Sequence, residues 1–267
     1  MPKRSDKDKN RDKSKDEKKP VEIVVVVPSF NNERFCEENV ELIAKQTYPH
    51  FSIYYIDDAS TDKTGELVEN YVKSHGLEKK CTIIHNKERK GVLENIYNTV
   101  HQIDPEKVVV LVDGDDWLAN DKVLERVAKA YENKNIWLTF GTLQTAIGRE
   151  LVCRTPFPEH VIKNCAFRTH DWVSSHLKTF YAKLFQQIKK EDLQKEGKFF
   201  PMSGDMAIMF PMLEMASDGH FEHIKEVLYI YNTFNPLSDF QVNVSLQREL
   251  ALYIRRLPPY KPLKKLF

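Results

Sequence analysis

Glycine is scarce in this sequence, and its distribution excludes two kinds of nucleotide site. The nine glycines among 267 residues lie at least seven positions apart. A dinucleotide-binding G-x-G-x-x-G fingerprint needs glycines two and three positions apart, and a P-loop needs a pair five positions apart. Neither motif is present, so a protein of this sequence that binds nucleotide phosphates must hold them by another means.

Cysteines and long apolar runs are also few. The four cysteines form no C-x-x-C pair and have no histidine at zinc-site spacing, which predicts reduced thiols in a reducing compartment. The longest apolar runs, 23–27 and 108–112, have the length of strands, far below the roughly 20 residues that cross a bilayer. No apolar signal segment follows the basic start of the chain. We therefore expect a cytoplasmic protein, and leave open a peripheral contact with the cytoplasmic face of a membrane.

Net charge is nearly absent overall, but it is unevenly placed. Forty Lys and Arg residues oppose 39 Asp and Glu residues, which argues against nucleic acid as a partner. Residues 1–19 carry nine basic and five acidic side chains and almost no apolar ones, so we expect a disordered charged tail. The remaining 31 basic and 34 acidic side chains leave residues 20–267 mildly acidic.

The pattern of apolar residues predicts an open α/β sheet. From residue 21 onward, short β-branched runs alternate with segments of helical spacing, as in a mostly parallel sheet flanked by helices. The expected strands are 21–27, 51–56, 81–85, 107–112, 136–140 and 227–231. The expected helices are 33–46, 62–75, 92–103, 121–133, 170–189, 203–215 with Ser203 as N-cap and a bend at Pro211, and 246–256. We divide the chain into an α/β half, 20–145, and a smaller α+β half, 146–267, within one continuous domain.

Acidic residues follow two of the expected strands. Ligands of open α/β sheets gather beyond the carboxyl ends of the strands. Residues 57–62 contain three aspartates after the second strand, where helix capping explains them as well as ligand binding does. Residues 113–116, Asp-Gly-Asp-Asp, follow the fourth strand, and their carboxylates repel one another unless a cation joins them. Such oxygen-rich sites suit Mg²⁺ or Mn²⁺ with a diphosphate, and Gly114 leaves room for a ligand to approach the backbone.

Several motifs in order give the sequence a specific resemblance. Val-Val-Val-Val-Pro-Ser-Phe-Asn-Asn at 24–32, Gln-Thr-Tyr at 46–48, Ile-Asp-Asp-Ala-Ser-Thr-Asp at 56–62 and Leu-Val-Asp-Gly-Asp-Asp at 111–116 resemble the family 2 glycosyltransferases, which have the GT-A type fold of nucleotide-diphospho-sugar transferases. The resemblance covers residues 21–145 and implies that the 20–145 half binds the nucleotide-sugar. It implies that Asp115, with Asp113, holds the metal. It implies donor-binding roles for Pro28, Phe30, Asn32, Asp58, Lys90, Asp113 and Gly114.

The second half has to supply the acceptor side and a base. Ser-Gly-Asp at 203–205 could be an ordinary helix start, because an acidic residue there is stabilised by the helix dipole. The family places its catalytic aspartate in such an element, so the resemblance implies that Asp205 is the base. It also places the segment around His176 on the acceptor side with Gly204, although a lone histidine is as readily a packed residue. Trp172 could stack on a sugar ring, although aromatic side chains more often pack in the core.

The resemblance implies an inverting transfer of a sugar, from a UDP-sugar, to an acceptor hydroxyl on a glycan, lipid-linked molecule or protein, with Mn²⁺ or Mg²⁺. One motif departs from the family, since Tyr-Asn-Thr-Phe at 231–234 replaces the usual Tyr-Arg-x-His. Asn232, Asn235 or a lysine of 261–265 could substitute. Two alternatives stay open: a Mg²⁺-dependent phosphohydrolase of haloacid-dehalogenase type with Asp113 as nucleophile, and a non-catalytic nucleotide- or glycan-binding module. The first leaves residues 57–62 unexplained, and Trp117 departs from its pattern.

Overall fold

The computed structural model describes residues 19–235 and 243–267, so the predicted tail lies outside the described residues except for Lys19. The first half of the chain forms a parallel sheet in the order β3-β2-β1-β4. Its strands are β1 (Ile23–Ser29), β2 (Phe51–Asp57), β3 (Cys81–His85) and β4 (Val108–Leu111). Every residue of β1 and β4 is buried, because helices cover both faces, and this explains their uninterrupted valine and isoleucine runs.

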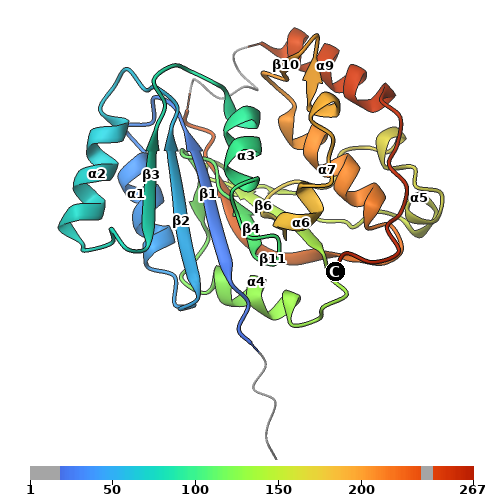
Figure 1. Ribbon diagram of the computed structural model, residues 1–267, viewed down its shortest axis with the longest axis horizontal. Helices are drawn as coiled ribbons and strands as arrows, with labels where there is room; N and C mark the ends of the chain where they lie inside the picture. Colours follow the sequence, from blue (N-terminus) through green and yellow to red (C-terminus); the bar gives the residue numbers. More distant parts are fainter. Residues whose placement is uncertain (1–18, 236–242) are drawn as a thin grey trace, which may run out of the picture.

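Helices alternate with these strands as the sequence predicted. They are α1 (Cys36–Ala44), α2 (Thr64–Ser74), α3 (Val92–Val100) and α4 (Val123–Tyr131). β1 rises from the lower end of the molecule, so the carboxyl ends of the parallel strands lie along its upper edge (Figure 1). The α/β architecture is confirmed.

The second half extends the sheet and changes its character. β8 (Lys178–Tyr181) runs antiparallel between β4 and β6 (Leu138–Thr145), and β11 (Phe221–Tyr231) then runs parallel to β6. The short strands β5 (Trp117–Leu118) and β7 (Leu151–Val152) complete a nine-stranded mixed sheet. Because β4, β6 and β11 point the same way, their carboxyl ends share the upper edge with those of β1 and β2. The sheet therefore places residues from both halves of the chain at one edge.

The helix predicted over residues 170–189 is wrong. This segment contains an extended stretch, β8, and only the short helix α6 (Ala182–Phe185). The run Lys-Thr-Phe-Tyr of β8 is buried throughout and rich in residues that favour strands. Its Thr179 hydroxyl lies 2.9 Å from the Tyr131 hydroxyl and 2.7 Å from that of Thr139. This segment is a strand because it pairs with β4 on one side and β6 on the other, and the local spacing of apolar residues does not reveal that pairing. The strand predicted at 227–231 is likewise the end of the longer β11.

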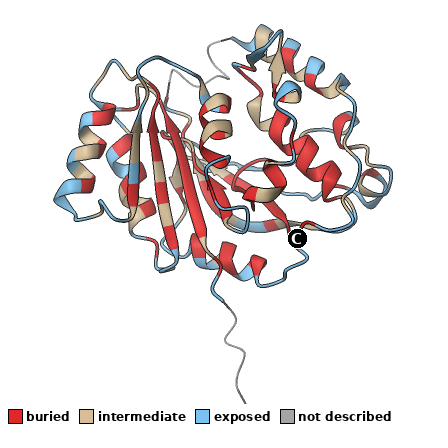
Figure 2. Cartoon of the chain, viewed as in Figure 1, coloured by how far each residue is buried: buried red, intermediate tan, exposed pale blue. Residues whose placement is uncertain are grey.

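A mostly helical layer packs beside this part of the sheet. Its central helix is α7 (Gly204–Met215), whose residues from Met206 onward are all buried, consistent with a helix that is apolar on all sides (Figure 2). Pro211 lies within this helix. Around it are α5 (Glu159–Lys163), the 3₁₀ turns η1 (Phe167–Thr169) and η2 (Lys190–Leu193), strands β9 (Gln194–Lys195) and β10 (Lys198–Phe199), and α9 (Val244–Arg256).

One hydrophobic core runs through both halves, from Val21 to Leu266. The four cysteines are free thiols, with Cys36 and Cys81 buried. Among the described residues, no helix combines the length and the apolar character that crossing a bilayer requires.

Candidate active site

The acid turn, residues 113–116, lies at the carboxyl end of β4 and is fixed by its neighbours on two sides. The Gly114 N–H donates to the Pro28 carbonyl at the end of β1, at 3.1 Å. From α1, the Asn39 amide donates to the carbonyls of Asp113 at 2.9 Å and of Asp116 at 2.7 Å. One side chain of α1 is therefore bonded to both ends of the acid turn.

Gly114 brings the acid turn against β1. A Cβ atom at this position would lie 2.4 Å from the Ser29 Oγ and 2.5 Å from the Ser29 Cβ. The sequence had suggested that this glycine leaves room for a ligand, but Ser29 occupies that room. The glycine is required by close packing of the protein itself.

Gly114→Ala is therefore expected to lower the free energy of unfolding by about 1–3 kcal/mol, the usual cost of overpacking. Urea denaturation measures this change. Gly204→Ala is the matched control, because the nearest atom to its added Cβ would be the Leu93 Cβ at 3.4 Å, an ordinary contact distance. Equal stability of the Gly114 variant and the wild type would contradict the packing role.

Asp116 joins the acid turn to β11. It is 1% exposed, and its carboxylate accepts hydrogen bonds from the Tyr229 hydroxyl and from the Asn232 N–H, both at 2.7 Å. Burial raises the pKa of Asp116 well above its ordinary value, and the nearby charges of Asp115 and Asp113 raise it further. Through these two hydrogen bonds, Asp116 attaches the acid turn to Tyr229 of β11 and to Asn232, which follows β11.

Two asparagines reach Asp115 from the segment that departs from the family motif. The Asn235 amide donates to the Asp115 Oδ2 at 2.7 Å, and the Asn232 amide donates to the Asp115 carbonyl at 3.0 Å. Asn235 also donates to the Asn32 side chain at 3.3 Å. The structure thus brings both asparagines to Asp115, the expected metal ligand. The lysines of 261–265 are not brought there, since the Leu263 N–H bonds to Met215, at the far end of α7.

His176 lies against the acid turn, 63 positions away from Asp113 in the sequence. Its Nε2 is 3.8 Å from the Asp113 Oδ2, and its ring stacks on Tyr229 at 4.4 Å. Burial, followed by the charge of Lys178, lowers the pKa of His176 well below its ordinary value, so the ring is neutral at pH 7. Within the described ranges, Asp113, Asp116 and His176 form the one group of metal-binding side chains whose ligand atoms all lie within 4.8 Å.

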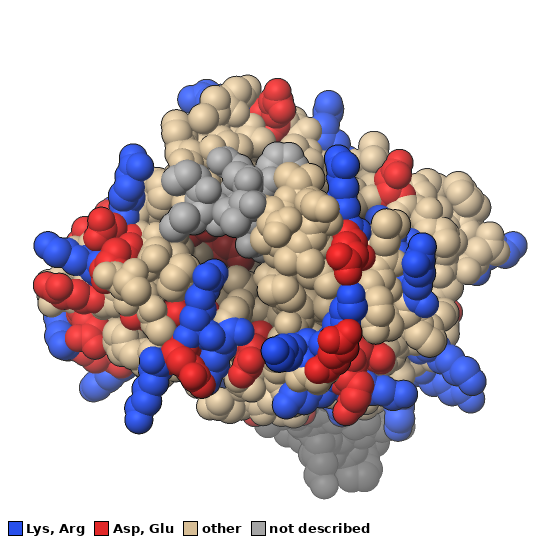
Figure 3. Space-filling model, turned by 90° about the horizontal axis from the view of Figure 1, so that it is seen from above, with Lys and Arg blue, Asp and Glu red and all other residues tan. Residues whose placement is uncertain are grey.

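These residues fit a divalent cation. The Asp113 side chain is 38% exposed, so its oxygens are accessible at the upper edge. Burial raises the pKa of the Asp115 carboxyl, an unfavourable setting for a charge that a bound cation would relieve. Carboxylates with a neutral imidazole beside them suit Mn²⁺ or Mg²⁺. Seen from above, the molecule has acidic side chains in a recess near the middle of this face (Figure 3).

On the other side of β1, Asp58 fixes the loop that precedes α3. It is 3% exposed and accepts hydrogen bonds from the Lys90 N–H at 2.9 Å, the Gly91 N–H at 2.8 Å and the Asn86 amide at 2.8 Å. Burial acts to raise its pKa, but these bonds and the Asn95 amide lower it overall. Asp58 and Lys90 are therefore brought together through the Lys90 backbone, while the Lys90 side chain is exposed.

The other expected donor residues lie along the same edge. Asn32 is buried between Ser29 and Asn235, and the half-buried Phe30 ring lies 3.9 Å beneath the Arg89 guanidinium. Asp62 does cap α2, because its Oδ1 accepts from the Thr64 N–H at 2.9 Å. The capping interpretation therefore accounts for Asp62, and Asp58 has a different role.

Asp205 lies in the first turn of α7 and is half-buried. Its Oδ1 accepts from the Met206 N–H at 2.9 Å. Ser203 occupies the N-cap position with a left-handed φ of 57°, but its hydroxyl does not cap the helix and donates instead to the Gln247 carbonyl of α9 at 3.1 Å. A non-glycine residue in this conformation is strained, and such strain is characteristic of functional sites. Trp172 meets Phe210 of α7 edge-on at 5.4 Å, so it belongs partly to the packing of this layer.

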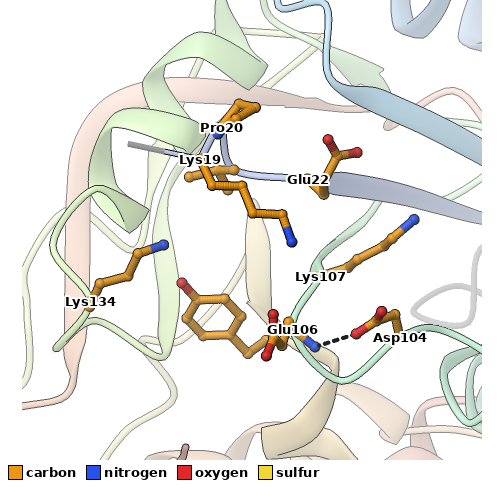
Figure 4. Close-up of a pocket in the computed structure, with 9 residues that line it drawn as sticks. Lys19, Pro20, Glu22, Asp104, Glu106, Lys107 and Lys134 are labelled. Carbon is orange, nitrogen blue, oxygen red and sulfur yellow. Dashed lines mark hydrogen bonds between the residues drawn. The ribbon is translucent and has the colours of Figure 1, made fainter. Parts of the chain in front are cut away.

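A cavity of about 100 Å³ lies elsewhere, at the opposite edge of the sheet. Lys19, Lys107 and Lys134 surround it together with Asp104 and Glu106, and the Glu106 N–H donates to the Asp104 carboxylate at 2.9 Å (Figure 4). Glu22 and Lys107, which also line it, immediately precede β1 and β4, so the cavity is separated from the acid turn by the length of these strands. It mixes charges of both signs and contains none of the expected site residues.

Comparison with known proteins finds glycosyltransferases, by sequence and by structure. The model of the family described as glycosyl transferase family 2 matches residues 24–209. The chain is 29% identical over 119 residues to glycosyltransferase GlyG of Streptococcus pneumoniae, covering 45% of this chain and 38% of that protein. It is 24% identical over 149 residues to the Escherichia coli UDP-Glc:alpha-D-GlcNAc-diphosphoundecaprenol beta-1,3-glucosyltransferase WfgD, covering 54% of this chain and 56% of that protein. The chain thus spans less than two thirds of the length of these relatives.

Solved structures support the GT-A type fold. Staphylococcus aureus TarS 1–349 in complex with UDP-GlcNAc superposes with a TM-score of 0.58 at 18% identity, over 80% of this chain and 59% of that one. The mannosyltransferase PcManGT from Pyrobaculum calidifontis, in complex with GDP-Man and Mn²⁺, superposes with a TM-score of 0.57 at 17% identity, over 80% of this chain and 57% of that one. None of these comparisons supports the haloacid-dehalogenase alternative.

Proposed function

This chain belongs to glycosyl transferase family 2, and from that premise we propose that it is a metal-dependent inverting glycosyltransferase with a UDP-sugar as donor. The observation that carries the proposal is the acid turn at the carboxyl edge of the sheet, with Asp113 exposed, Asp115 held by Asn235, and a neutral His176 beside them.

Asp113 and Asp115 would hold Mn²⁺ or Mg²⁺, and Asp113 also lies in one group with Asp116 and His176. When bound, the ion supplies positive charge to the diphosphate that leaves with the nucleotide. The chain's own residues fix the geometry, since Asn39 and Asp116 hold the turn and Asn235 orients Asp115. On the other side of β1, Asp58 keeps the 86–91 loop in place for the nucleoside.

Asp205 is the proposed general base. The acceptor hydroxyl oxygen would form a bond to the anomeric carbon of the donor sugar as the bond from that carbon to the diphosphate oxygen breaks. Asp205 takes the hydroxyl proton, and the nucleoside diphosphate leaves with the bonding pair. A single displacement of this kind inverts the anomeric configuration.

The donor and acceptor rest on the relatives. TarS structures contain UDP or UDP-GlcNAc, and the name of WfgD specifies a UDP-glucose donor with an acceptor linked to diphosphoundecaprenol. A UDP-sugar and a glycan, lipid-linked or protein hydroxyl are therefore the proposed substrates. A cytoplasmic location, with contact to the cytoplasmic face of a membrane when the acceptor is lipid-linked, is the matching proposal.

Asp115→Ala is expected to weaken UDP binding in Mn²⁺ by at least about 10-fold, because an ionic ligand to the cation is lost. Isothermal titration calorimetry with and without Mn²⁺ measures the change. Asp121→Ala, which removes an exposed aspartate just after the acid turn, is the matched control and should bind UDP as the wild type does. Unchanged affinity of the Asp115 variant would remove it as the ligand.

Slow hydrolysis of the UDP-sugar without acceptor separates an active enzyme from a binding module with the same site. Its absence in a wild-type protein that binds the UDP-sugar would favour the binding module.

A further inference from the structure

Lys178 is a buried cation at the acid turn that the proposed chemistry has not yet used. It begins β8, paired with Leu111 of β4, and is 5% exposed. Its Nζ lies 3.1 Å from the Nε2 of His176. An ammonium group can only donate, so Nε2 accepts this hydrogen bond and the ring proton is on Nδ1.

The ammonium group has fewer partners than its burial requires. An ammonium has three N–H donors, and a buried charge is costly unless it is paired. Among the residues that the structure describes, His176 Nε2 is its one hydrogen-bond partner and no carboxylate forms an ion pair with it. The His176 Nδ1 is also buried and has no partner in the described part of the chain. An anion is the ligand that the ammonium and this ring nitrogen lack.

The position of Lys178 indicates which anion. The His176 ring that Lys178 contacts lies 3.8 Å from the Asp113 Oδ2, measured from the ring Nε2. Lys178 is therefore one side chain away from a residue proposed to hold the cation beside the diphosphate. The anionic group proposed to lie nearest to it during transfer is the phosphate that carries the sugar.

We propose that Lys178 binds the β-phosphate of the donor and stabilises the charge that develops on it as the bond to the sugar breaks. This inference rests on the proposed function. A fixed ammonium next to the leaving group stabilises the transition state without reorganisation, and His176 holds the lysine in place for it. Lys178 would thereby add a second positive charge beside the diphosphate.

The test compares UDP with UMP, which lacks the β-phosphate. In Mn²⁺, Lys178→Gln is expected to weaken UDP binding by about 10- to 100-fold and to leave UMP binding within about 2-fold of the wild type. Gln keeps a donor for His176 and removes the charge. Lys178→Arg should retain most of the preference for UDP, and Lys129→Met, at an exposed lysine of α4, should retain all of it.

A lysine that only offsets the charge of the acid turn would change the affinities for UDP and UMP by the same factor, and that result would overturn the proposal. If the Gln variant does not fold, NMR of the lysine Nζ groups in ¹⁵N-lysine-labelled wild-type protein tests the proposal instead. The signal that is missing from the Lys178→Arg variant is assigned to Lys178. UDP, but not UMP, should shift the Lys178 signal, and equal shifts would overturn the proposal. A wild-type protein that binds neither nucleotide contradicts the proposed function itself.

Discussion

Asp205→Asn is expected to slow sugar transfer by about 10²- to 10⁴-fold, the contribution of a positioned general base. An amide is nearly isosteric with the carboxylate but cannot take the acceptor proton. UDP binding in Mn²⁺ should be unchanged, since Asp205 lies in the first turn of α7, accepts there from the Met206 N–H, and is not among the residues proposed to hold the metal or the nucleotide. Single-turnover transfer assays and calorimetry measure the two quantities separately.

The matched control is Asp218→Asn, an exposed aspartate in the loop that follows α7. It makes the same chemical change beyond the other end of the helix and should keep full transfer activity. Transfer by the Asp205 variant at more than about a tenth of the wild-type rate would contradict the assignment, because it would fall outside the range expected for loss of a base.

Arg168→Met is expected to reduce the free energy of unfolding by about 3–5 kcal/mol, the usual cost of leaving a buried charge without its partner. The Arg168 guanidinium donates to both carboxylate oxygens of Glu214, which is 0% exposed, and to the Ile254 carbonyl of α9 at 2.6 Å. Burial raises the pKa of Glu214 even with the arginine present. The pair ties α7, which carries Asp205, to η1 and α9.

A double-mutant cycle tests this account by urea denaturation. Adding Glu214→Gln to Arg168→Met should recover part of the lost stability, because the uncompensated charge is then removed. Arg154→Met changes an exposed arginine and should alter stability by less than about 0.5 kcal/mol. Additive effects of the two buried substitutions would mean that the ion pair is not the source of the loss.

The fold of the first half followed closely from the sequence. Its strands are short β-branched runs, and its helices have regular apolar spacing, so local patterns and burial favour the same conformation. The segment 170–189 shows where this agreement fails. There the spacing of apolar residues suits a helix, but the contacts of Thr179 with β6 and α4 are available only to a strand between β4 and β6.

The sequence by itself determined that phosphates cannot be bound by glycine loops and that an acidic turn ends the fourth strand, because both follow from neighbouring residues. Only the tertiary structure decided that Ser29 is the reason for Gly114, that Asn235 reaches Asp115, and that His176 and Lys178 lie at the same turn. His176 is 63 positions from Asp113 in the sequence, and Asn235 is 120 positions from Asp115. The contact of Gly114 with Ser29 joins the ends of two different strands, β4 and β1. Such pairings depend on strand order, and a mixed sheet that inserts β8 between β4 and β6 has no local signal in the chain.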